Sequence, residues 1–401
     1  MPNVYFSMDK QALMPQEEVL LRKNKQRSLT VGIPKESDDC ENRIVLTPET
    51  VHNLVNQGHQ ILVESDAGTG CNYTNLQYSE MGAYIVDRAE VYQADILLKI
   101  NPPQLKEIQL MKTRQVLFSF LPPFQLNEDY INLLINKQIT ALSFDTIKDH
   151  NGCYPLVRSM SEIAGTLAIQ LASKYMSLAA DGKGILLGGV SGVNPAEVVI
   201  IGAGTAAEFA ARAAIGMGAF VRIFDNSVHR LQRIQEHLGQ RLYTSVMHPQ
   251  VLKRALASAD ALIGAVYQKA TDTGYLLSED MVAGMKKGAV IVDLSINHGG
   301  CCETSEVCNI KRPTFSKHGV IHYCVPNVTS LVPQTASIAI SNIVSNIITD
   351  MAMQGNIANW FRINANIRNG VYLFNGILTD ASIGDLLGMS SKDINLLMVA
   401  F

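Results

Sequence analysis

Residues 198–207 read Val-Val-Ile-Ile-Gly-Ala-Gly-Thr-Ala-Ala, an apolar run that ends in two closely spaced glycines. Gly202 suits a tight turn after a strand, and Gly204 lets the backbone come close to a bound group. The third small position of this pattern is Ala207, which allows a following helix to pack close to the strand. The run therefore predicts a buried strand, a glycine turn and the N-terminus of a helix.

A second apolar run ends on an acidic residue at the spacing that dinucleotide-binding units use. Residues 219–224 read Ala-Phe-Val-Arg-Ile-Phe, and Asp225 follows twenty-three positions after Gly202. Free N–H groups at a helix N-terminus favour phosphate oxygens, so Ala203 and Thr205 join the predicted cofactor residues. An acid such as Asp225 accepts hydrogen bonds from ribose hydroxyls and repels a 2′-phosphate. A glycine turn alone is compatible with ordinary packing, but this whole pattern favours NAD.

The composition fits a large protein with buried cores and no nucleic-acid partner. With 401 residues the chain is long enough for two domains. Its formal net charge of −3 provides no basic field for a nucleic acid. Seven cysteines without a Cys-x-x-Cys pair, and an N-terminal region without a continuous apolar signal segment, favour reduced thiols in the cytoplasm.

Metal binding and membrane insertion are not expected. Cys301, Cys302 and Cys308 lie close together, but no second ligand pair stands at a zinc-like spacing, so we predict ordinary buried or loop thiols. The longest apolar stretches are interrupted before they reach the length of a bilayer span. Residues 1–28 are expected to form an extension on the surface or on a neighbouring subunit.

Strand and helix patterns alternate over most of the chain, which predicts parallel sheets covered by helices. The predicted strands outside the glycine motif are residues 29–34, 60–64, 96–100, 116–120, 140–143, 261–266, 289–294 and 320–325. Long helices are predicted from Ser161 onward and over about residues 335–354. We therefore expect two Rossmann-like α/β domains, each with a doubly wound parallel sheet. Residues 29–155 and 335–401 would form a discontinuous substrate domain, and residues 156–334 the NAD-binding domain.

Two cations follow predicted strands of the first domain, at the edge where α/β folds bind ligands. Arg43 lies in the loop after the first strand, and Lys99 ends the run Ala-Asp-Ile-Leu-Leu of residues 94–98. An arginine grips both oxygens of a carboxylate, and a lysine acts as a mobile point charge. From composition alone the simpler interpretation is preferred, with Arg43 a solvated loop charge and Lys99 an ordinary residue at a strand end.

Several runs change that interpretation, because together they resemble the alanine dehydrogenase family, which includes the NAD(H)-binding subunit of proton-translocating transhydrogenase. The matching runs include Val31-Gly-Ile-Pro-Lys-Glu36, Glu41-Asn-Arg-Ile-Val-Leu-Thr-Pro48, Val63-Glu-Ser-Asp-Ala-Gly68, Ala94-Asp-Ile-Leu-Leu-Lys99, Met160-Ser-Glu-Ile-Ala-Gly165 and Lys317-His-Gly-Val-Ile-His-Tyr323. The similarity runs in order from about residue 30 to 345 and is strongest to the dehydrogenase branch.

The resemblance implies an activity and a set of site residues. Alanine dehydrogenases oxidise L-alanine with NAD to an imine, which water converts to pyruvate and ammonia. Arg43 and Lys99 fall on the positions that hold the substrate. Five residues fall on positions that line the NAD site: Ser161, at the start of the long helix, Asp225, Arg230, Val266 and Asn327. By the same resemblance a homo-oligomer is expected, often a hexamer.

Two departures from the family bear on catalysis. Pro122, in Phe118-Ser-Phe-Leu-Pro-Pro-Phe124, stands where the catalytic histidine aligns, and Asn297 stands where the catalytic aspartate aligns. Amine oxidation through an imine needs proton transfers by a group that titrates near neutrality. Proline has no titratable group, and asparagine orients a water without relaying its proton. The loss of both groups is expected to lower the rate by several orders of magnitude.

Other residues offer limited compensation. His298 adjoins Asn297, but neighbouring side chains on extended backbone point in opposite directions, so His298 is not expected to reach the substrate. His318 and His322 are expected to be packed and hydrogen-bonded. Lys99 is the best titratable candidate, since burial beside Arg43 would lower its pKa. We therefore assign catalytic roles to Lys99 and Asn297.

Three functions stay open. The first is an NAD-dependent dehydrogenase for L-alanine or a related small amino acid and its 2-oxo acid. The second is a transhydrogenase-like hydride carrier, because that branch also has a Phe-Leu-x-Pro-like stretch near residue 122. The third is a non-catalytic NADH-binding protein. The intact Arg43 and Lys99 favour the first.

Overall fold

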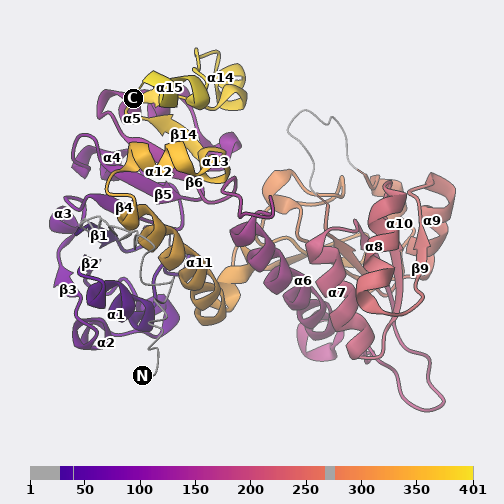
Figure 1. The fold of residues 1–401 in the computed structure, drawn as a ribbon. Coiled ribbons are helices and arrows are strands. Elements are labelled where there is room, and N and C mark those ends of the chain that lie inside the picture. The colour runs from indigo at the N-terminus through magenta and orange to yellow at the C-terminus, as the bar shows by residue number, and fades with distance from the viewer. Residues whose placement is uncertain (1–27, 39, 267–275, 401) are drawn as a thin grey trace, which may run out of the picture.

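The chain forms two lobes, each built around its own β-sheet (Figure 1). The computed structural model describes residues 28–38, 40–266 and 276–400. The N-terminal extension that the sequence predicts lies outside these residues, except for Ser28.

The first sheet combines the N-terminal part of the chain with its C-terminal end. Its strand order is β15-β14-β6-β5-β4-β1-β2-β3. Its strands are β1 (Thr30–Ile33), β2 (Gln60–Glu64), β3 (Tyr84–Val86), β4 (Ile96–Leu98), β5 (Val116–Ser119), β6 (Thr140–Ser143), β14 (Val371–Phe374) and β15 (Ile377–Leu378). The strands from β1 to β6 are parallel, whereas β14 and β15 are antiparallel to their neighbours.

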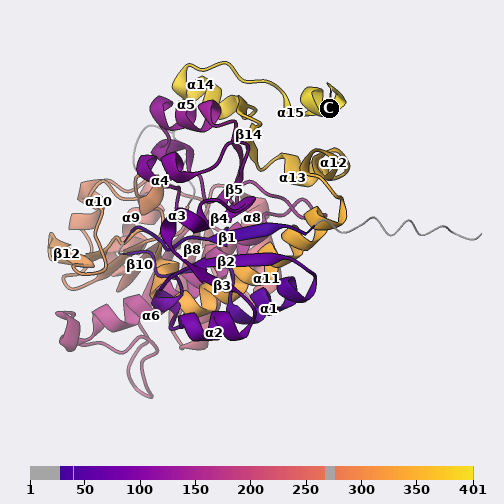
Figure 2. The ribbon, with the colours of Figure 1, turned by 90° about the vertical axis from the view of Figure 1, so that its left-hand side faces the viewer.

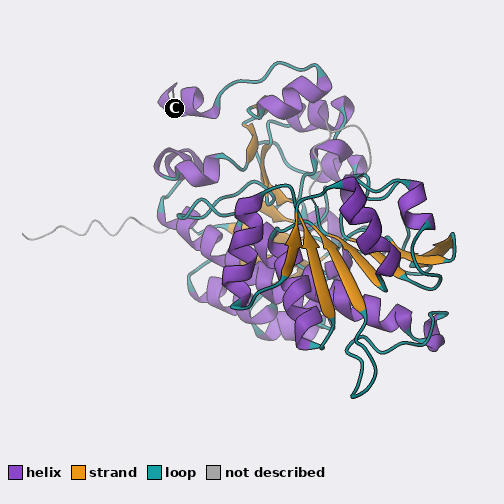
Figure 3. Ribbon diagram, turned by 90° about the vertical axis from the view of Figure 1, so that its right-hand side faces the viewer, coloured by secondary structure: helices purple, strands orange, loops and turns teal. Residues whose placement is uncertain are grey.

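The second sheet takes all its strands from the middle of the chain. Its order is β12-β13-β11-β10-β7-β8-β9, and it is parallel except for β12. Its strands are β7 (Glu197–Ile201), β8 (Phe220–Phe224), β9 (Tyr243–Ser245), β10 (Ala261–Gly264), β11 (Val290–Asp293), β12 (Thr314–Lys317) and β13 (Val320–Tyr323). Helices cover both of its faces (Figure 3).

Helices follow most of the strands. In the first lobe they are α1 (Pro48–Asn56), α2 (Asn75–Glu80), α3 (Arg88–Val91), α4 (Leu105–Leu110), α5 (Glu128–Asn136), α12 (Ile357–Ile363), α13 (Ala365–Arg368), α14 (Ala381–Leu387) and α15 (Ile394–Ala400). In the second lobe they are α7 (Thr205–Gly216), α8 (Val228–Leu238), α9 (Pro249–Ser258) and α10 (Glu279–Ala283). The long helices α6 (Pro155–Met176) and α11 (Pro333–Met353) lie where the chain passes between the lobes (Figure 1).

The α/β class and the two parallel-centred sheets are confirmed, and two features differ from the expectation. Each sheet has an antiparallel edge that ends in a hairpin with a two-residue turn: β12–β13 in the second sheet, and β14–β15 in the first, where β14 is also antiparallel to β6. These turns are His318-Gly319 and Asn375-Gly376, and all four residues have positive φ, as tight hairpin turns require. The predicted strands also extend up to two residues too far at their carboxyl ends. The domain boundaries at residues 155 and 335 stay a prediction.

The long helix α6 begins earlier than the sequence analysis places it, so the expectation that Ser161 opens it is wrong. Pro155 takes the first helical position, where its fixed φ suits the helix and no backbone hydrogen bond is lost. Ser161 therefore lies in the second turn, where its backbone N–H belongs to the helix. Only its side chain is available to a ligand.

Helix α11 is 21 residues long, and its most apolar window has a mean hydropathy of 1.2, enough by length and composition to cross a bilayer. Polar residues such as Asn342 and Asn346 interrupt its apolar stretches. Half of that window is buried inside the protein. The same properties are found in core helices, so α11 is weak evidence for a membrane span.

The C-terminal segment is fixed to the first lobe by aromatic packing. Trp360 is fully buried, and its ring centroid lies 6.4 Å from that of Phe118 on β5. Its indole Nε1 donates a 2.7 Å hydrogen bond to Asp350 on α11. In Figure 2, α12 to α15 accordingly lie beside the strands and helices of the N-terminal part of the chain.

Helices α6 and α7 approach each other closely at a glycine. A Cβ atom on Gly165 would lie 2.1 Å from the carbonyl oxygen of Ala206, which is shorter than any van der Waals contact. The absence of a side chain at residue 165 therefore sets the distance between α6 and the helix that follows the glycine turn.

We predict that Gly165→Ala lowers the free energy of unfolding by about 1–3 kcal/mol, because the added methyl group forces the two helices apart. The measurement is the thermal midpoint by circular dichroism. Gly216→Ala, at the end of α7, is the control because a Cβ there meets no atom within 4 Å. Equal midpoints for the two variants would contradict close packing at Gly165.

Candidate functional site

The loop between β1 and α1 is held by hydroxyl groups from a distant part of the chain. The backbone N–H of Ile44 donates to Ser337 Oγ at 2.9 Å, and that of Asn42 donates to Ser330 Oγ at 2.9 Å. Ser341, on α11 like Ser337, accepts from the N–H of Thr47 at 3.0 Å, whereas Ser330 lies in the 3₁₀ helix Val328–Leu331. These three serines are buried. They fix the backbone on both sides of Arg43.

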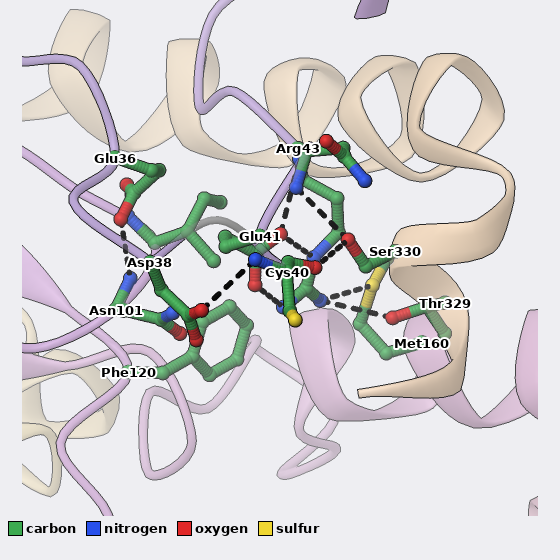
Figure 4. A network of polar contacts seen from close by, with 12 residues as sticks. Glu36, Asp38, Cys40, Glu41, Arg43, Asn101, Phe120, Met160, Thr329 and Ser330 are labelled. Atoms are coloured by element: carbon green, nitrogen blue, oxygen red, sulfur yellow. Dashed lines mark hydrogen bonds and ion pairs between the residues drawn. The ribbon is translucent and has the colours of Figure 1, made fainter. Parts of the chain in front are cut away.

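Arg43 is buried and enclosed by partners from three elements (Figure 4). Its Nε and Nη2 donate to the two oxygens of Glu41 at 2.7 and 2.5 Å, a bidentate pair. Nη1 donates to Thr329 Oγ1 at 3.0 Å and lies 3.6 Å from the sulfur of Met160 on α6. The ring of Phe120 lies 5.9 Å from the guanidinium carbon. The prediction of a solvated loop charge at residue 43 is therefore wrong.

The Arg43–Glu41 pair is almost completely removed from water. The two side chains expose 4% and 0% of their surface. Burial alone lowers the pKa of Arg43, but the attraction and hydrogen bonds of Glu41 outweigh it and raise the pKa. Arg43 is therefore a permanent cation, and Glu41 neutralises most of its charge.

Lys99 is the second buried cation, in the loop that leaves β4. Its Nζ donates to Glu36 Oε2 at 2.7 Å and lies 3.9 Å from Glu107 Oε2. Glu36 also accepts from the backbone N–H of Ile100 at 2.6 Å. Burial raises the pKa of Glu36 although Lys99 opposes this, and the Glu36 charge also acts on Arg43. Glu36 therefore connects the two cations electrostatically.

Asp145 adds another carboxyl group to this cluster. It lies two residues after the end of β6 and is partly buried. Burial raises its pKa to about 6, although the charge of Arg43 and a hydrogen bond with the Ser143 side chain act in the opposite direction. Asp145 thus exchanges a proton in the neutral range, which an ordinary aspartate does not.

Carboxyl groups outnumber cations in this part of the first lobe. Arg43 and Lys99 are accompanied by Glu36, Glu41, Glu107 and Asp145. The cations can face the carboxylate of a ligand, and the acidic groups can face an ammonium group on the same ligand. This charge balance suits a small zwitterion.

The glycine turn of the second lobe has the geometry that the sequence predicts for a phosphate-binding turn. Gly202 has φ +107°, and a Cβ there would lie 2.3 Å from the carbonyl oxygen of Ala265. At Gly204 a Cβ would meet no atom within 4 Å, so the backbone is open to a bound group. Thr205 begins α7, whose first N–H groups lack partners within the helix, and Ala207 is fully buried. These residues fit a dinucleotide diphosphate.

Asp225 ends β8 and reaches back to this turn. Its Oδ2 accepts from the N–H of Ala203 at 2.8 Å, and its Oδ1 accepts from the N–H of Ser227 at 2.7 Å. Arg230, largely exposed on α8, lies 3.9 Å from the same carboxylate. The carboxylate is therefore held next to the turn, where it can meet a ribose.

The remaining predicted cofactor residues lie at the ends of other strands. Val266 follows β10, and its N–H donates to Ser295 Oγ at 3.2 Å. Ser295 in turn donates its N–H to Asp293 at the end of β11, at 2.9 Å. Asn327 is exposed in a left-handed conformation, with φ +51°, just before the 3₁₀ helix Val328–Leu331 that carries Thr329.

The two positions that depart from the family lie at short 3₁₀ helices, Pro122 directly before one and Asn297 within another. Pro122 precedes the 3₁₀ helix Pro123–Gln125 after β5. Asn297 and His298 belong to the 3₁₀ helix Ile296–His298 after β11. The expectation of extended backbone at Asn297 is wrong, because the chain turns here to enter a glycine pair with positive φ at 299 and 300. Successive side chains in such a helix diverge by about 120°, not 180°.

The two histidines expected to be packed and hydrogen-bonded, His318 and His322, both have hydrogen-bond partners. His322 is fully buried, and its ring bonds to Thr304 and the Val320 carbonyl; burial lowers its pKa. His318 lies in a hairpin turn beside Glu279.

The thiols of Cys301 and Cys302 are buried near the Asp293 carboxylate, and their ligand atoms lie within 4.8 Å of one another. Contact with Cys302 and burial raise the pKa of the Cys301 thiol, which disfavours the thiolate that a metal needs. Asp293 already accepts from the Cys301 N–H at 2.8 Å and from the Ser305 hydroxyl at 2.7 Å. Cys308 is not part of this group. We assign no metal to the group of Asp293, Cys301 and Cys302.

Sequence reasoning missed Thr329, Glu36 and Asp145. Asp145 follows a buried strand, the same signal that identified Lys99, but it belongs to none of the matching runs. Glu36 ends one of those runs and was not assigned a role. Thr329 is separated from Arg43 by 286 residues, so only the folded structure brings them together.

Comparison with known proteins places this geometry in a family. Models of the alanine dehydrogenase/PNT N-terminal and C-terminal domains match residues 32–164 and 168–381. An alanine dehydrogenase of Staphylococcus saprophyticus is 36% identical over 369 residues, which cover 91% of this chain and 99% of that protein. This chain belongs to the alanine dehydrogenase/PNT family. Alanine dehydrogenase 2 of Staphylococcus aureus is 34% identical over the same length.

Solved structures agree with this assignment. An L-alanine dehydrogenase superposes with a TM-score of 0.84 at 32% identity, covering 89% of this chain and 99% of that one. A transhydrogenase from Sinorhizobium meliloti superposes with a TM-score of 0.75 at 21% identity, covering 88% and 99%, and shares the fold. The chain is thus an oxidoreductase-family protein with a nucleotide-binding domain for a pyridine nucleotide.

The pKa of Asp145 predicts a pH-dependent stability. Its folded pKa of about 6 exceeds the reference of 3.8, so the folded state holds the proton more tightly than the unfolded state. The stability due to this proton is present below about pH 4 and is lost as pH rises to about 6, a loss of up to about 3 kcal/mol. Asp145→Asn should therefore melt at a higher temperature than the wild type at about pH 8, with the difference shrinking toward pH 4. Parallel melting curves across this range would contradict the raised pKa.

Proposed function

We propose that this protein is an NAD-dependent amino-acid dehydrogenase that interconverts L-alanine, or a related small amino acid, with its 2-oxo acid and ammonia. The observation that carries the proposal is the pair of buried cations, Arg43 and Lys99, in loops that leave the adjacent strands β1 and β4. Removing charged side chains from water costs free energy, and we infer that substrate binding is the reason these two cations are buried.

The substrate class follows from the charges around Arg43. The guanidinium would hold the substrate carboxylate, and the acidic residues would match its ammonium group. Because Glu41 already occupies the Nε–Nη2 edge of Arg43, the substrate has access to the Nη1 side, where Thr329 now lies. We therefore expect Thr329 to give way or to share the bound carboxylate.

The cofactor would lie across the glycine turn. Gly202, Ala203, Gly204, Thr205 and Ala207 would meet the diphosphate, and Asp225 with Arg230 the adenosine ribose. Ser161, Val266 and Asn327 would line the remainder of the site. When bound, the nicotinamide supplies the hydride acceptor of the reaction. Catalytic roles for Lys99 and Asn297 remain part of the proposal.

A transhydrogenase-like hydride carrier is the second candidate, favoured by one observation. Neither Pro122 nor Asn297 provides a titratable group, and hydride exchange between two nicotinamides needs none from the protein. The two candidates differ in their need for ammonia.

The deciding experiment follows NADH oxidation with pyruvate, and with a panel of small 2-oxo acids, in the presence and absence of ammonia. The dehydrogenase requires both the 2-oxo acid and ammonia. A protein that binds NADH, shown by nucleotide fluorescence, but oxidises none with any pair of substrates does not have the proposed activity.

Arg43→Lys should weaken 2-oxo acid binding at least about tenfold and leave NADH affinity unchanged, because lysine keeps the charge but loses the planar fork. KM for the 2-oxo acid and Kd for NADH measure the two effects. Arg114→Lys is the control, since Arg114 is exposed and precedes the amino end of β5. Unchanged KM in Arg43→Lys would remove Arg43 from the substrate site.

Asp225→Ser should change the ratio of the NADPH and NADH dissociation constants at least about tenfold in favour of NADPH. The substitution removes the acceptor for ribose hydroxyls and frees Arg230, 3.9 Å away, to face a 2′-phosphate. Fluorescence titrations with both nucleotides provide the measurement, and Glu236→Ser, which removes an exposed acid from α8, is the control. A ratio that moves equally in both variants would place the ribose elsewhere.

A further inference from the structure

The proposed reaction needs a proton carrier that the departures at residues 122 and 297 do not supply. Oxidation of an amine requires the substrate ammonium to lose a proton before hydride leaves its carbon. Lys99 is held by Glu36 at 2.7 Å and has Glu107 at 3.9 Å, so its ammonium is already committed to an ion pair. Another group must exchange this proton.

Asp145 lies next to the position of the missing histidine. Strands β5 and β6 are parallel neighbours, so the segments that leave their carboxyl ends run side by side. The Ser143 hydroxyl joins them, because it accepts from the N–H of Leu121 at 3.2 Å and from the N–H of Asp145 at 3.4 Å. Leu121 directly precedes Pro122. One hydroxyl therefore positions both the proline and the aspartate.

Asp145 is also electrostatically coupled to Arg43, the residue assigned to the substrate carboxylate. A single carbon atom separates the carboxylate and the ammonium of an α-amino acid. If Arg43 holds the carboxylate, the substrate nitrogen lies in the same part of the site as the Asp145 carboxyl group. Asp145 as a whole residue is partly buried, and its surroundings desolvate the carboxyl group enough to raise its pKa.

A further titratable group near Asp145 is a tyrosine on β14, the strand that pairs with β6 on the side away from β5. Tyr372 on β14 is buried, and burial raises its pKa to about 12, so it stays protonated across the physiological range. Arg43 remains charged over the same range. Asp145 is therefore the group of this set whose protonation changes near neutral pH.

We propose that Asp145 is the general acid–base residue of the reaction, in place of the histidine that the family has at residue 122. This inference rests on the proposed dehydrogenase function. In the oxidative direction an N–H bond of the substrate ammonium breaks, the nitrogen keeps the electron pair, and an O–H bond forms on the Asp145 carboxylate. In the reductive direction the protonated Asp145 returns this proton to the nitrogen.

The test compares the wild type with Asp145→Asn, Asp145→Glu and the control Asp95→Asn. Asp95 lies at the opposite, amino end of β4, in an ion pair with Lys112. Steady-state rates of amino-acid oxidation are measured from about pH 5 to 9, together with NADH binding and thermal midpoints. In the wild type, kcat/KM should rise with pH and level off above about pH 6, because the base form is the carboxylate.

Asp145→Asn should lower kcat about 10²–10⁴-fold and lose this pH dependence, with unchanged NADH affinity. Asp145→Glu, which keeps a carboxyl group, should recover part of the rate together with a pH-dependent limb. A purely structural role would lower the rate in both variants without changing the shape of the profile.

The outcomes separate the two proposals. If the wild type oxidises an amino acid and Asp145→Asn retains its pH profile with less than about a threefold loss of rate, Asp145 is not the acid–base residue, and the dehydrogenase assignment stands. If the wild type oxidises no amino acid while it binds NADH, the dehydrogenase function fails and the role of Asp145 fails with it. If Asp145→Asn does not fold, the pH dependence of kcat/KM in Asp145→Glu is the deciding measurement. A rate equal to that of the wild type, with the rise in kcat/KM at the same pH, would overturn the proposal.

Discussion

The Arg43 guanidinium and the Glu41 carboxylate meet inside the protein, where neither charge is solvated by water. Removing one partner of such a pair typically costs about 3–5 kcal/mol, because the other charge is left buried and alone. The pair also has a fixed geometry, since two of its hydrogen bonds are parallel and a third joins Thr329. Everything that lies close to Arg43 is therefore placed relative to a rigid group.

This arrangement connects parts of the chain that form different lobes. Arg43 follows a strand of the first sheet, Met160 belongs to α6, and Thr329 follows a strand of the second sheet. Ser330 in the 3₁₀ helix before α11 and Ser337 on α11 hold the backbone on either side of the arginine. A ligand that competes with Thr329 for Arg43 would consequently alter one of the contacts between the lobes.

The features that sequence could reveal are those with a local cause. Gly202 and Gly204 identify the cofactor turn because positive φ and open backbone are properties of glycine itself. Lys99 is identified because it ends an apolar run. Ser161 is misplaced because the helix start depends on Pro155, six residues earlier, whose role as first helical residue outweighs the periodicity that begins at residue 161. Thr329 is unpredictable from sequence because its partner is 286 residues away.

The acidic residues give a physical reason why proline can stand at residue 122. A histidine there would carry a positive charge when protonated, whereas Asp145 would exchange a proton through a negative charge that Arg43 stabilises. An aspartate with an ordinary pKa is a weak base at neutral pH, so burial is needed to raise its basicity toward that of histidine. The same burial destabilises the folded protein above about pH 6, since the ionised carboxylate is poorly solvated there. Desolvation of the Asp145 side chain thus has two consequences: it makes the carboxylate a stronger base, and it lowers the stability of the folded protein above about pH 6.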